Sequence, residues 1–169
     1  SGGIPLGSIL SNMFGSKANE ESEPYDNKKR VKTEKRPKEK KKSVVITLTD
    51  YNRNRERDVK LLEICLRNYE VVYLFPQGTG DIPYITELGY IDRLQFVSPQ
   101  IHAYNAILES GDVDYIGTRL HAGIRALQKS VRSFIIGIDN RAKEMSRDFG
   151  LPVLDENRIE ELEEWINAP

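Results

Sequence analysis

The sequence has little of the residue types that build metal sites and disulfides: one cysteine, Cys65, and two histidines, His102 and His121. A single cysteine excludes an intramolecular disulfide and any multi-cysteine metal site, so we expect no bound metal and a reducing, cytoplasmic setting. No run approaches the roughly 18–20 consecutive apolar residues of a membrane span. The first residues also lack the charged and apolar regions of a secretory signal.

Motifs that bind common cofactors are missing as well. The first predicted strand is followed by Thr-Asp-Tyr-Asn-Arg at residues 49–53. This segment has no glycine, whereas the dinucleotide-binding fingerprint needs several at that point. No phosphate loop of the nucleoside-triphosphatase type occurs either. We therefore expect no nicotinamide, flavin or other cofactor.

The net charge of −1 conceals an uneven distribution. Residues 1–42 contain 11 lysines and arginines against 6 acidic residues, whereas residues 43–169 contain 14 against 20. Binding to nucleic acid depends on neutralising phosphates. A net-acidic folded part is therefore not expected to bind nucleic acid.

The composition divides the chain at about residue 42. Residues 16–42 are almost wholly polar and cannot bury enough apolar surface to offset the entropy of ordering, so residues 1–42 are predicted to be a disordered basic linker or tail without contacts to the core. A short apolar stretch at residues 4–14 is interpreted as a remnant of a preceding element or a docking segment. Binding of the tail to an acidic partner or to a membrane surface is the less favoured alternative.

From residue 43 onward, apolar runs alternate with amphipathic segments. The runs predict strands over residues 44–48, 71–75, 94–97, 113–117 and 134–138, with a short apolar run at 151–154. Helices are predicted between them: one begins at Ser98 and Pro99, one lies between Asp139 and Gly150, and the last is capped by Asn157. Strands that are apolar throughout are typical of a parallel sheet covered on both faces. Residues 43–169 are therefore predicted to form a doubly wound, Rossmann-like α/β domain.

The loop after the fourth predicted strand is the most informative candidate site, because ligands bind at the carboxyl ends of strands in such sheets. Residues 117–123 read Gly-Thr-Arg-Leu-His-Ala-Gly. Arg119 offers a bidentate donor for a carboxylate or phosphate, and His121 exchanges a proton near neutral pH. Gly117 and Thr118 are assigned to substrate binding beside them. The alternative is that Arg119 pairs with an acidic neighbour and His121 is structural.

Other loops at the same edge supply further candidates. Gln77 and Gly78, in the glycine-containing loop 76–81, are assigned to substrate binding, as is Asn140 after the fifth strand. The alternative for loop 76–81 is that its glycines and proline only form a turn. The charged tract at residues 52–57 could receive an anion or be an ordinary loop and first helical turn. His102 is interpreted as structural and Cys65 as part of the core.

The region from Asp112 to Pro152 resembles the C-terminal half of the polysaccharide pyruvyl transferase family. The resemblance rests on Gly-Thr-Arg-Leu-His-Ala-Gly-Ile-Arg-Ala-Leu-Gln at residues 117–128 and Ile-Gly-Ile-Asp-Asn-Arg-Ala-Lys-Glu-Met at residues 136–145. It extends over residues 43–169. It implies a GT-B-type C-terminal domain with its active site in the cleft between two Rossmann-like halves.

The resemblance also implies a reaction and roles for residues. Family members transfer the pyruvate unit of phosphoenolpyruvate, as a ketal, to a sugar of a cell-surface polysaccharide. It implies that Arg119 holds the carboxylate or phosphate of the donor and that His121 is the general acid or base. The expected partners are phosphoenolpyruvate, a sugar or lipid-linked glycan acceptor, and an N-terminal half of the same enzyme. Peripheral association with the inner face of the membrane is a further possibility.

Two alternatives stay open at this point. A GT-B-like glycosyltransferase would use a nucleotide-sugar and needs an acid for the ribose, for which Glu160 and Glu161 are candidates or plain surface charges. A non-catalytic Rossmann-like binding domain is the third interpretation. Residues 129–133, Lys-Ser-Val-Arg-Ser, replace the glycine-valine-proline turn that is common in the family. This departure indicates a divergent branch and leaves the acceptor sugar open.

Overall fold

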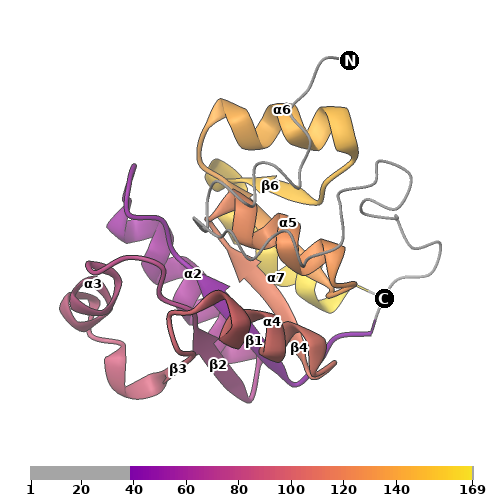
Figure 1. Ribbon diagram of the computed structural model, residues 1–169. Helices are drawn as coiled ribbons and strands as arrows, with labels where there is room; N and C mark the ends of the chain where they lie inside the picture. Colours follow the sequence, from indigo (N-terminus) through magenta and orange to yellow (C-terminus); the bar gives the residue numbers. More distant parts are fainter. Residues whose placement is uncertain (1–38, 169) are drawn as a thin grey trace.

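The computed structural model describes residues 39–168, which form a six-stranded, all-parallel sheet (Figure 1). Its order is β3-β2-β1-β4-β5-β6, so the direction of winding reverses between β1 and β4. The strands are β1 (Ser43–Thr47), β2 (Val71–Leu74), β3 (Gln95–Phe96), β4 (Val113–Gly117), β5 (Ser133–Gly137) and β6 (Val153–Asp155). The predicted doubly wound, Rossmann-like fold is confirmed.

Helices cover both faces of the sheet. They are α2 (Arg55–Asn68), α3 (Asp81–Leu88), η2 (Ile91–Arg93), α4 (Ile101–Glu109), α5 (Leu120–Gln128), α6 (Asn140–Phe149), η3 (Glu156–Glu161) and α7 (Leu162–Asn167). One buried cluster joins α2, α3 and α7 to Val44 and Ile46 of β1, and a second joins α4, α5 and α6 to Val45 of the same strand. Successive residues of a strand point to opposite faces, which is why Val44, Val45 and Ile46 of β1 are all apolar. Buried β4 departs from this pattern at Asp114.

The helix boundaries follow the sequence signals in part. Asp139 caps α6 by accepting a hydrogen bond from the backbone N–H of Ala142, and Gly150 ends the helix in the left-handed conformation, as predicted. The predicted start of α4 at Ser98 and Pro99 is wrong. The backbone N–H of Gln100 donates to the Ser98 carbonyl in a local turn, and Gln100 keeps extended dihedrals, so the helix begins only at Ile101.

Two further elements differ from the prediction. Asp155, not Asn157, caps the segment after β6, because its side chain accepts from the backbone N–H of Asn157. Helix α3 was not predicted: Pro83 lies in its first turn and two glycines precede it, a composition that indicates a loop. The helix ends at Gly89, which adopts a φ of 87°.

The predicted tail falls mostly on residues 1–38, outside the described residues, as does the apolar stretch at 4–14. The expectation of no contact with the core is wrong for residues 40–42. The backbone N–H of Lys41 donates to Asp114 Oδ2 at 3.4 Å, and the Lys40 ammonium lies 4.4 Å from the centre of the Tyr69 ring. Asp114 is fully buried, and a buried carboxylate needs hydrogen-bond donors; Tyr69 and Arg132 also donate to its Oδ2. Within residues 39–168, no helix combines the length and apolar character needed to cross a membrane.

Close packing of α5 on the sheet depends on Gly123. A Cβ atom at this position would lie 2.5 Å from Ile135 Cγ1 and 3.0 Å from Tyr115 Cε2. We expect Gly123→Ala to lower the free energy of unfolding by about 1–3 kcal/mol, the cost of overpacking a core. Urea denaturation measures this change. Gly80→Ala is the matched control because its Cβ would approach the Arg53 guanidinium no closer than 3.7 Å; equal losses in both variants would contradict the packing argument.

Candidate functional site

The carboxyl ends of β1, β2, β4 and β5 carry a connected group of charged side chains. The loops that follow these strands contribute Asp50, Asp81, Arg119 and Asp139. This is the edge at which the winding reverses, between β1 and β4. Crevices at such reversals bind ligands in doubly wound proteins. The fold therefore brings the predicted loops to one place.

Arg119 is the residue immediately before α5, and its guanidinium is held by three partners. Its Nη2 donates to both carboxylate oxygens of Asp81 at 3.2 Å, and its Nε donates to the backbone carbonyl of Leu48 at 2.8 Å. Asp50 adds a longer ion pair at 4.0 Å. Only 10% of the Arg119 side chain is exposed. The pairing with an acidic neighbour, which was the alternative for this residue, is therefore present.

Asp81, the first residue of α3, accepts hydrogen bonds from several residues at this edge. Besides Arg119, its carboxylate accepts from Arg53 Nη2 at 3.3 Å and from the backbone N–H groups of Gln77 and Gly78 at 2.8 and 3.2 Å. Its side chain is 3% exposed. Sequence reasoning placed Asp81 at the end of a candidate loop but gave it no role. Its position in the first turn of α3 could have been found only by predicting that helix.

His121, in the first turn of α5, bonds to a residue that the sequence reasoning did not assign. Arg141 Nη2, from the first turn of α6, lies 2.8 Å from His121 Nε2 and 3.5 Å from Nδ1. Arginine offers only donors, so the imidazole nitrogen must be the acceptor and carries no proton. Partial burial, and then the positive charge of Arg141, lower the pKa of His121 to about 4. The histidine is therefore neutral at pH 7.

This lowered pKa predicts a pH dependence of stability. The unfolded chain binds a proton on His121 near its ordinary pKa of 6.5, whereas the folded protein does so only near 4. Stability conferred by the neutral form is thus complete above about pH 6.5 and is lost as the pH falls towards 4. Between pH 6.5 and 5.5, the free energy of unfolding of His121→Gln should fall less steeply than that of the wild type. The difference cannot exceed about 1.4 kcal/mol per pH unit, and it is smaller because His121 is only partly buried. Identical slopes in urea denaturation would contradict the assignment.

Asp139 connects the His121 side of the edge to the loop after β1. Its Oδ1 caps α6, and its Oδ2 accepts from the Tyr51 hydroxyl at 3.0 Å. Partial burial and the neighbouring Asp139 carboxylate raise the pKa of Tyr51. Tyr51 therefore stays a neutral donor, and both oxygens of Asp139 are engaged.

Of three other predicted site residues, Gly117 and Thr118 are buried and Asn140 is exposed. Thr118 is buried, and its hydroxyl accepts from the backbone N–H of Thr49 at 2.8 Å, which fixes the loop after β1. Gly117 packs against Thr47, whose carbonyl oxygen would lie 2.7 Å from an added Cβ. Both residues hold neighbouring backbone in place. Asn140 is exposed at the start of α6.

The loop after β2 approaches Arg119 directly. An added Cβ at Gly78 would lie 3.5 Å from Asp50 Oδ2 and 3.8 Å from Arg119 Nη2. The Oε1 atom of Gln77 is buried and has no hydrogen-bond partner among the residues that the structure describes. Gly78 thus lies beside Arg119, and Gln77 is joined to Arg119 through Asp81, to which both donate.

The remaining candidates lie elsewhere or are engaged. His102 is exposed in the first turn of α4, and Cys65 is fully buried in the core, where burial raises the pKa of its thiol. In the tract at 52–57, Arg53 donates to Asp81 and lies over the Tyr84 ring. Arg57 is buried between Asp58 and Glu156.

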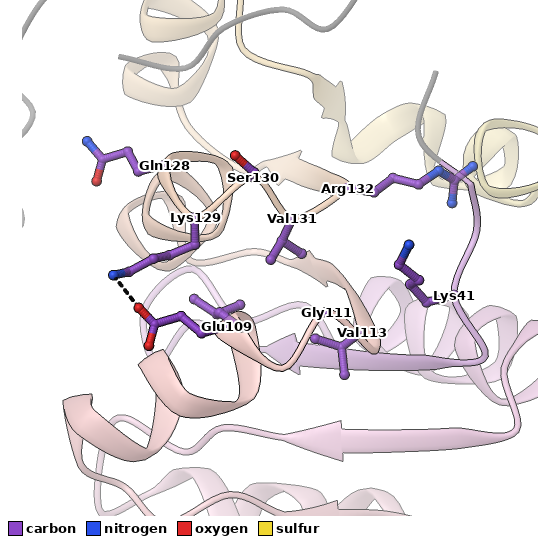
Figure 2. A pocket seen from close by; sticks show the side chains of 10 residues that line it. Lys41, Glu109, Gly111, Val113, Gln128, Lys129, Ser130, Val131 and Arg132 are labelled. Atoms are coloured by element: carbon purple, nitrogen blue, oxygen red, sulfur yellow. Dashed lines mark hydrogen bonds and ion pairs between the residues drawn. The ribbon is translucent and has the colours of Figure 1, made fainter. Parts of the chain in front are cut away.

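A cavity of about 420 Å³ lies at the opposite edge of the sheet, where β4 and β5 begin (Figure 2). Its lining includes Lys41, Glu109, Lys129 and Arg132. Lys129 pairs with Glu109 at 2.8 Å, and Arg132 pairs with Asp114 at 3.0 Å. This cavity is separate from the predicted site. Arg119 and His121 follow the carboxyl end of β4, whereas the cavity lies where β4 begins.

Groups that could bind a metal ion are missing from the described part of the chain: no three histidine, cysteine, aspartate or glutamate side chains lie together in residues 39–168. The edge instead carries the guanidinium groups of Arg53, Arg119 and Arg141 beside the carboxylates of Asp50, Asp81 and Asp139. Arg53 and Arg119 form ion pairs with Asp81, whereas Arg141 bonds to the His121 imidazole. Comparison of the chain with protein-family models, curated proteins and solved structures finds no match in any of the three.

Proposed function

We propose that this chain is the C-terminal half of a pyruvyl transferase that moves the pyruvate unit of phosphoenolpyruvate, as a ketal, onto a sugar of a cell-surface polysaccharide. One observation carries the proposal. The Arg-Leu-His motif opens α5 at the carboxyl end of β4, at the reversal point of the sheet, with the imidazole of His121 beside the guanidinium of Arg141.

The reaction needs both a proton carrier and cationic partners. The methylene carbon of the donor gains a proton, its central carbon gains two sugar oxygens, and phosphate departs. Of the two protons that the sugar hydroxyls release, the net reaction places one on the new methyl group and one on phosphate. An imidazole at this edge supplies the proton carrier. The donor's carboxylate and phosphate call for arginine and backbone N–H donors.

The competing enzyme function has less support. A nucleotide-sugar glycosyltransferase needs an acidic group for the ribose, and Glu160 and Glu161 were the candidates. In the structure, Glu160 pairs with Lys60 at 3.1 Å and Glu161 pairs with Arg158 at 2.7 Å. Both acids thus have cationic partners at the surface.

Ligand-dependent thermal stability of the 169-residue chain tests the proposal. A ligand that binds only the folded state raises Tm by mass action, and at about 100 times its Kd adds about 2.7 kcal/mol. We expect phosphoenolpyruvate to raise Tm and UDP-glucose to leave it unchanged, with pyruvate as the control for a donor that lacks phosphate. A rise with UDP-glucose alone would favour the glycosyltransferase. No rise with either ligand would favour a non-catalytic domain.

A further inference from the structure

Arg141 differs from the other arginines at the carboxyl edge in what holds it. Arg53 and Arg119 both donate to the buried carboxylate of Asp81. Arg141 is exposed and, within residues 39–168, has no carboxylate within 4.0 Å; its partner is the imidazole of His121. Its positive charge is therefore not compensated by a direct ion pair, whereas that of Arg119 is.

We propose that Arg141 binds the anionic group of the donor and that this binding raises the fraction of His121 that carries a proton. The proposal deepens the pyruvyl transfer function, on which it rests for the identity of the donor. Its chemistry requires only a carboxylate or phosphate that accepts hydrogen bonds from a guanidinium.

The hydrogen bond between Arg141 and His121 and the protonation of His121 at Nε2 exclude each other. Arg141 Nη2 can only donate, so His121 Nε2, at 2.8 Å, must accept with its lone pair. A protonated imidazole has no lone pair left and cannot keep this bond. The free site therefore holds His121 neutral for as long as Arg141 bonds to it.

Binding of an anion would change both the hydrogen bond that Arg141 donates and the affinity of His121 for a proton. Its oxygens accept hydrogen bonds from Arg141 more strongly than a neutral imidazole does, because ionised partners give the stronger bonds. The guanidinium turns to the anion, its charge is compensated, and Nε2 takes one proton from solvent. No other group needs to gain or lose a proton.

The surrounding charges agree with this sequence of events. Asp139, at the start of α6, favours the protonated form of His121, but its two oxygens are occupied by Tyr51 and by the backbone N–H of Ala142. Among the described residues, Asp139 and Arg141 form no ion pair within 4.0 Å, so Arg141 stays with the histidine in the free protein. Arg119, which precedes α5, is compensated by Asp81 and Asp50. Arg141 is thus the charge that an anion would change.

Coupling the binding of the donor at Arg141 to the protonation of His121 would favour the proposed reaction. Protonation of the donor's methylene carbon needs a charged imidazole only when the donor is present. Loading the proton together with the donor supplies this acid without holding two positive groups in contact in the free protein.

Imidazole NMR titration of the 169-residue chain, with and without inorganic phosphate, tests the proposal. His102 and His121 are its only histidines, so two sets of signals suffice. We expect phosphate to raise the pKa of His121 by about 1–3 pH units, from about 4 to between about 5 and 7, the usual effect of an opposite charge at this range. At pH 7 the charged form then rises from about one part in a thousand to as much as about half. The His102 signals should not respond to phosphate. An unchanged titration of His121 at saturating phosphate would overturn the proposal.

Two variants separate Arg141 from general charge effects. Arg141→Gln should abolish the response to phosphate and raise the pKa of His121 in the free protein. Arg147→Gln, an exposed position on the same helix, should leave both unchanged. A response to phosphate that persists in Arg141→Gln would assign the anion to another residue. A coupling that depends on Arg141, combined with no stabilisation by phosphoenolpyruvate, would keep this inference for an anion and remove only the pyruvyl transfer function.

Discussion

Replacing His121 by glutamine should lower kcat for pyruvyl transfer by roughly 10²–10⁴-fold, the usual loss when a general acid–base group is removed. Glutamine keeps an oxygen that can accept from Arg141, so the fold and the position of the guanidinium are preserved. It has no group that exchanges a proton near neutral pH. The KM for phosphoenolpyruvate should change much less than kcat. Phosphate release in the presence of a glycan acceptor, with the chain joined to an N-terminal half, measures both constants.

Two other substitutions serve as controls for this result. His102→Gln changes the other histidine, which is exposed on α4. Gln128→Ala changes the last residue of α5, which lines the cavity at the opposite edge of the sheet. Both variants should keep near-normal kcat. If His121→Gln also keeps it while remaining folded, His121 is a structural histidine and the proton carrier lies elsewhere.

The fold could be predicted because its signals are local. Val113–Gly117 is buried at every residue and matches the predicted strand at both ends. Asp139 and Gly150 bound α6 through their own side-chain and backbone preferences. Helix α3 escaped prediction because Pro83 and the preceding glycines indicate a loop, whereas the burial of Tyr84, Ile85 and Leu88 stabilises a helix only once the sheet exists.

The site could be predicted only in part, because its bonds join distant segments. The sequence indicates that Arg119 and His121 begin a helix at a ligand-binding edge. It does not indicate that Asp81, 38 residues before Arg119, supplies the carboxylate that compensates it. Nor does it pair His121 with Arg141, although the neighbouring Asn140 was already a candidate site residue. Both pairings follow from the strand order, which places the loops after β2, β1, β4 and β5 side by side.

The buried carboxylate of Asp81 predicts the largest loss of stability at this edge. Asp81→Ala removes the acceptor for Arg119, Arg53 and two backbone N–H groups. Arg119 is left largely buried with its charge uncompensated except by the distant Asp50. Breaking a buried ion pair from one side costs about 3–5 kcal/mol. Urea denaturation should show a loss in this range, against about 0.5 kcal/mol or less for Asp148→Ala at an exposed position on α6.

A second substitution distinguishes an uncompensated charge from a merely disturbed loop. In the Asp81→Ala background, Arg119→Met removes the buried charge, so part of the lost stability should return. Arg119→Met alone should be destabilising, because it leaves the Asp81 carboxylate buried with fewer donors. The coupling energy from this double-mutant cycle should therefore be favourable and well above the additivity error of about 0.5 kcal/mol. Additive losses would mean that the two side chains act independently. In that case the ion pair with Asp81 would no longer explain why an anion binds to Arg141 rather than to Arg119.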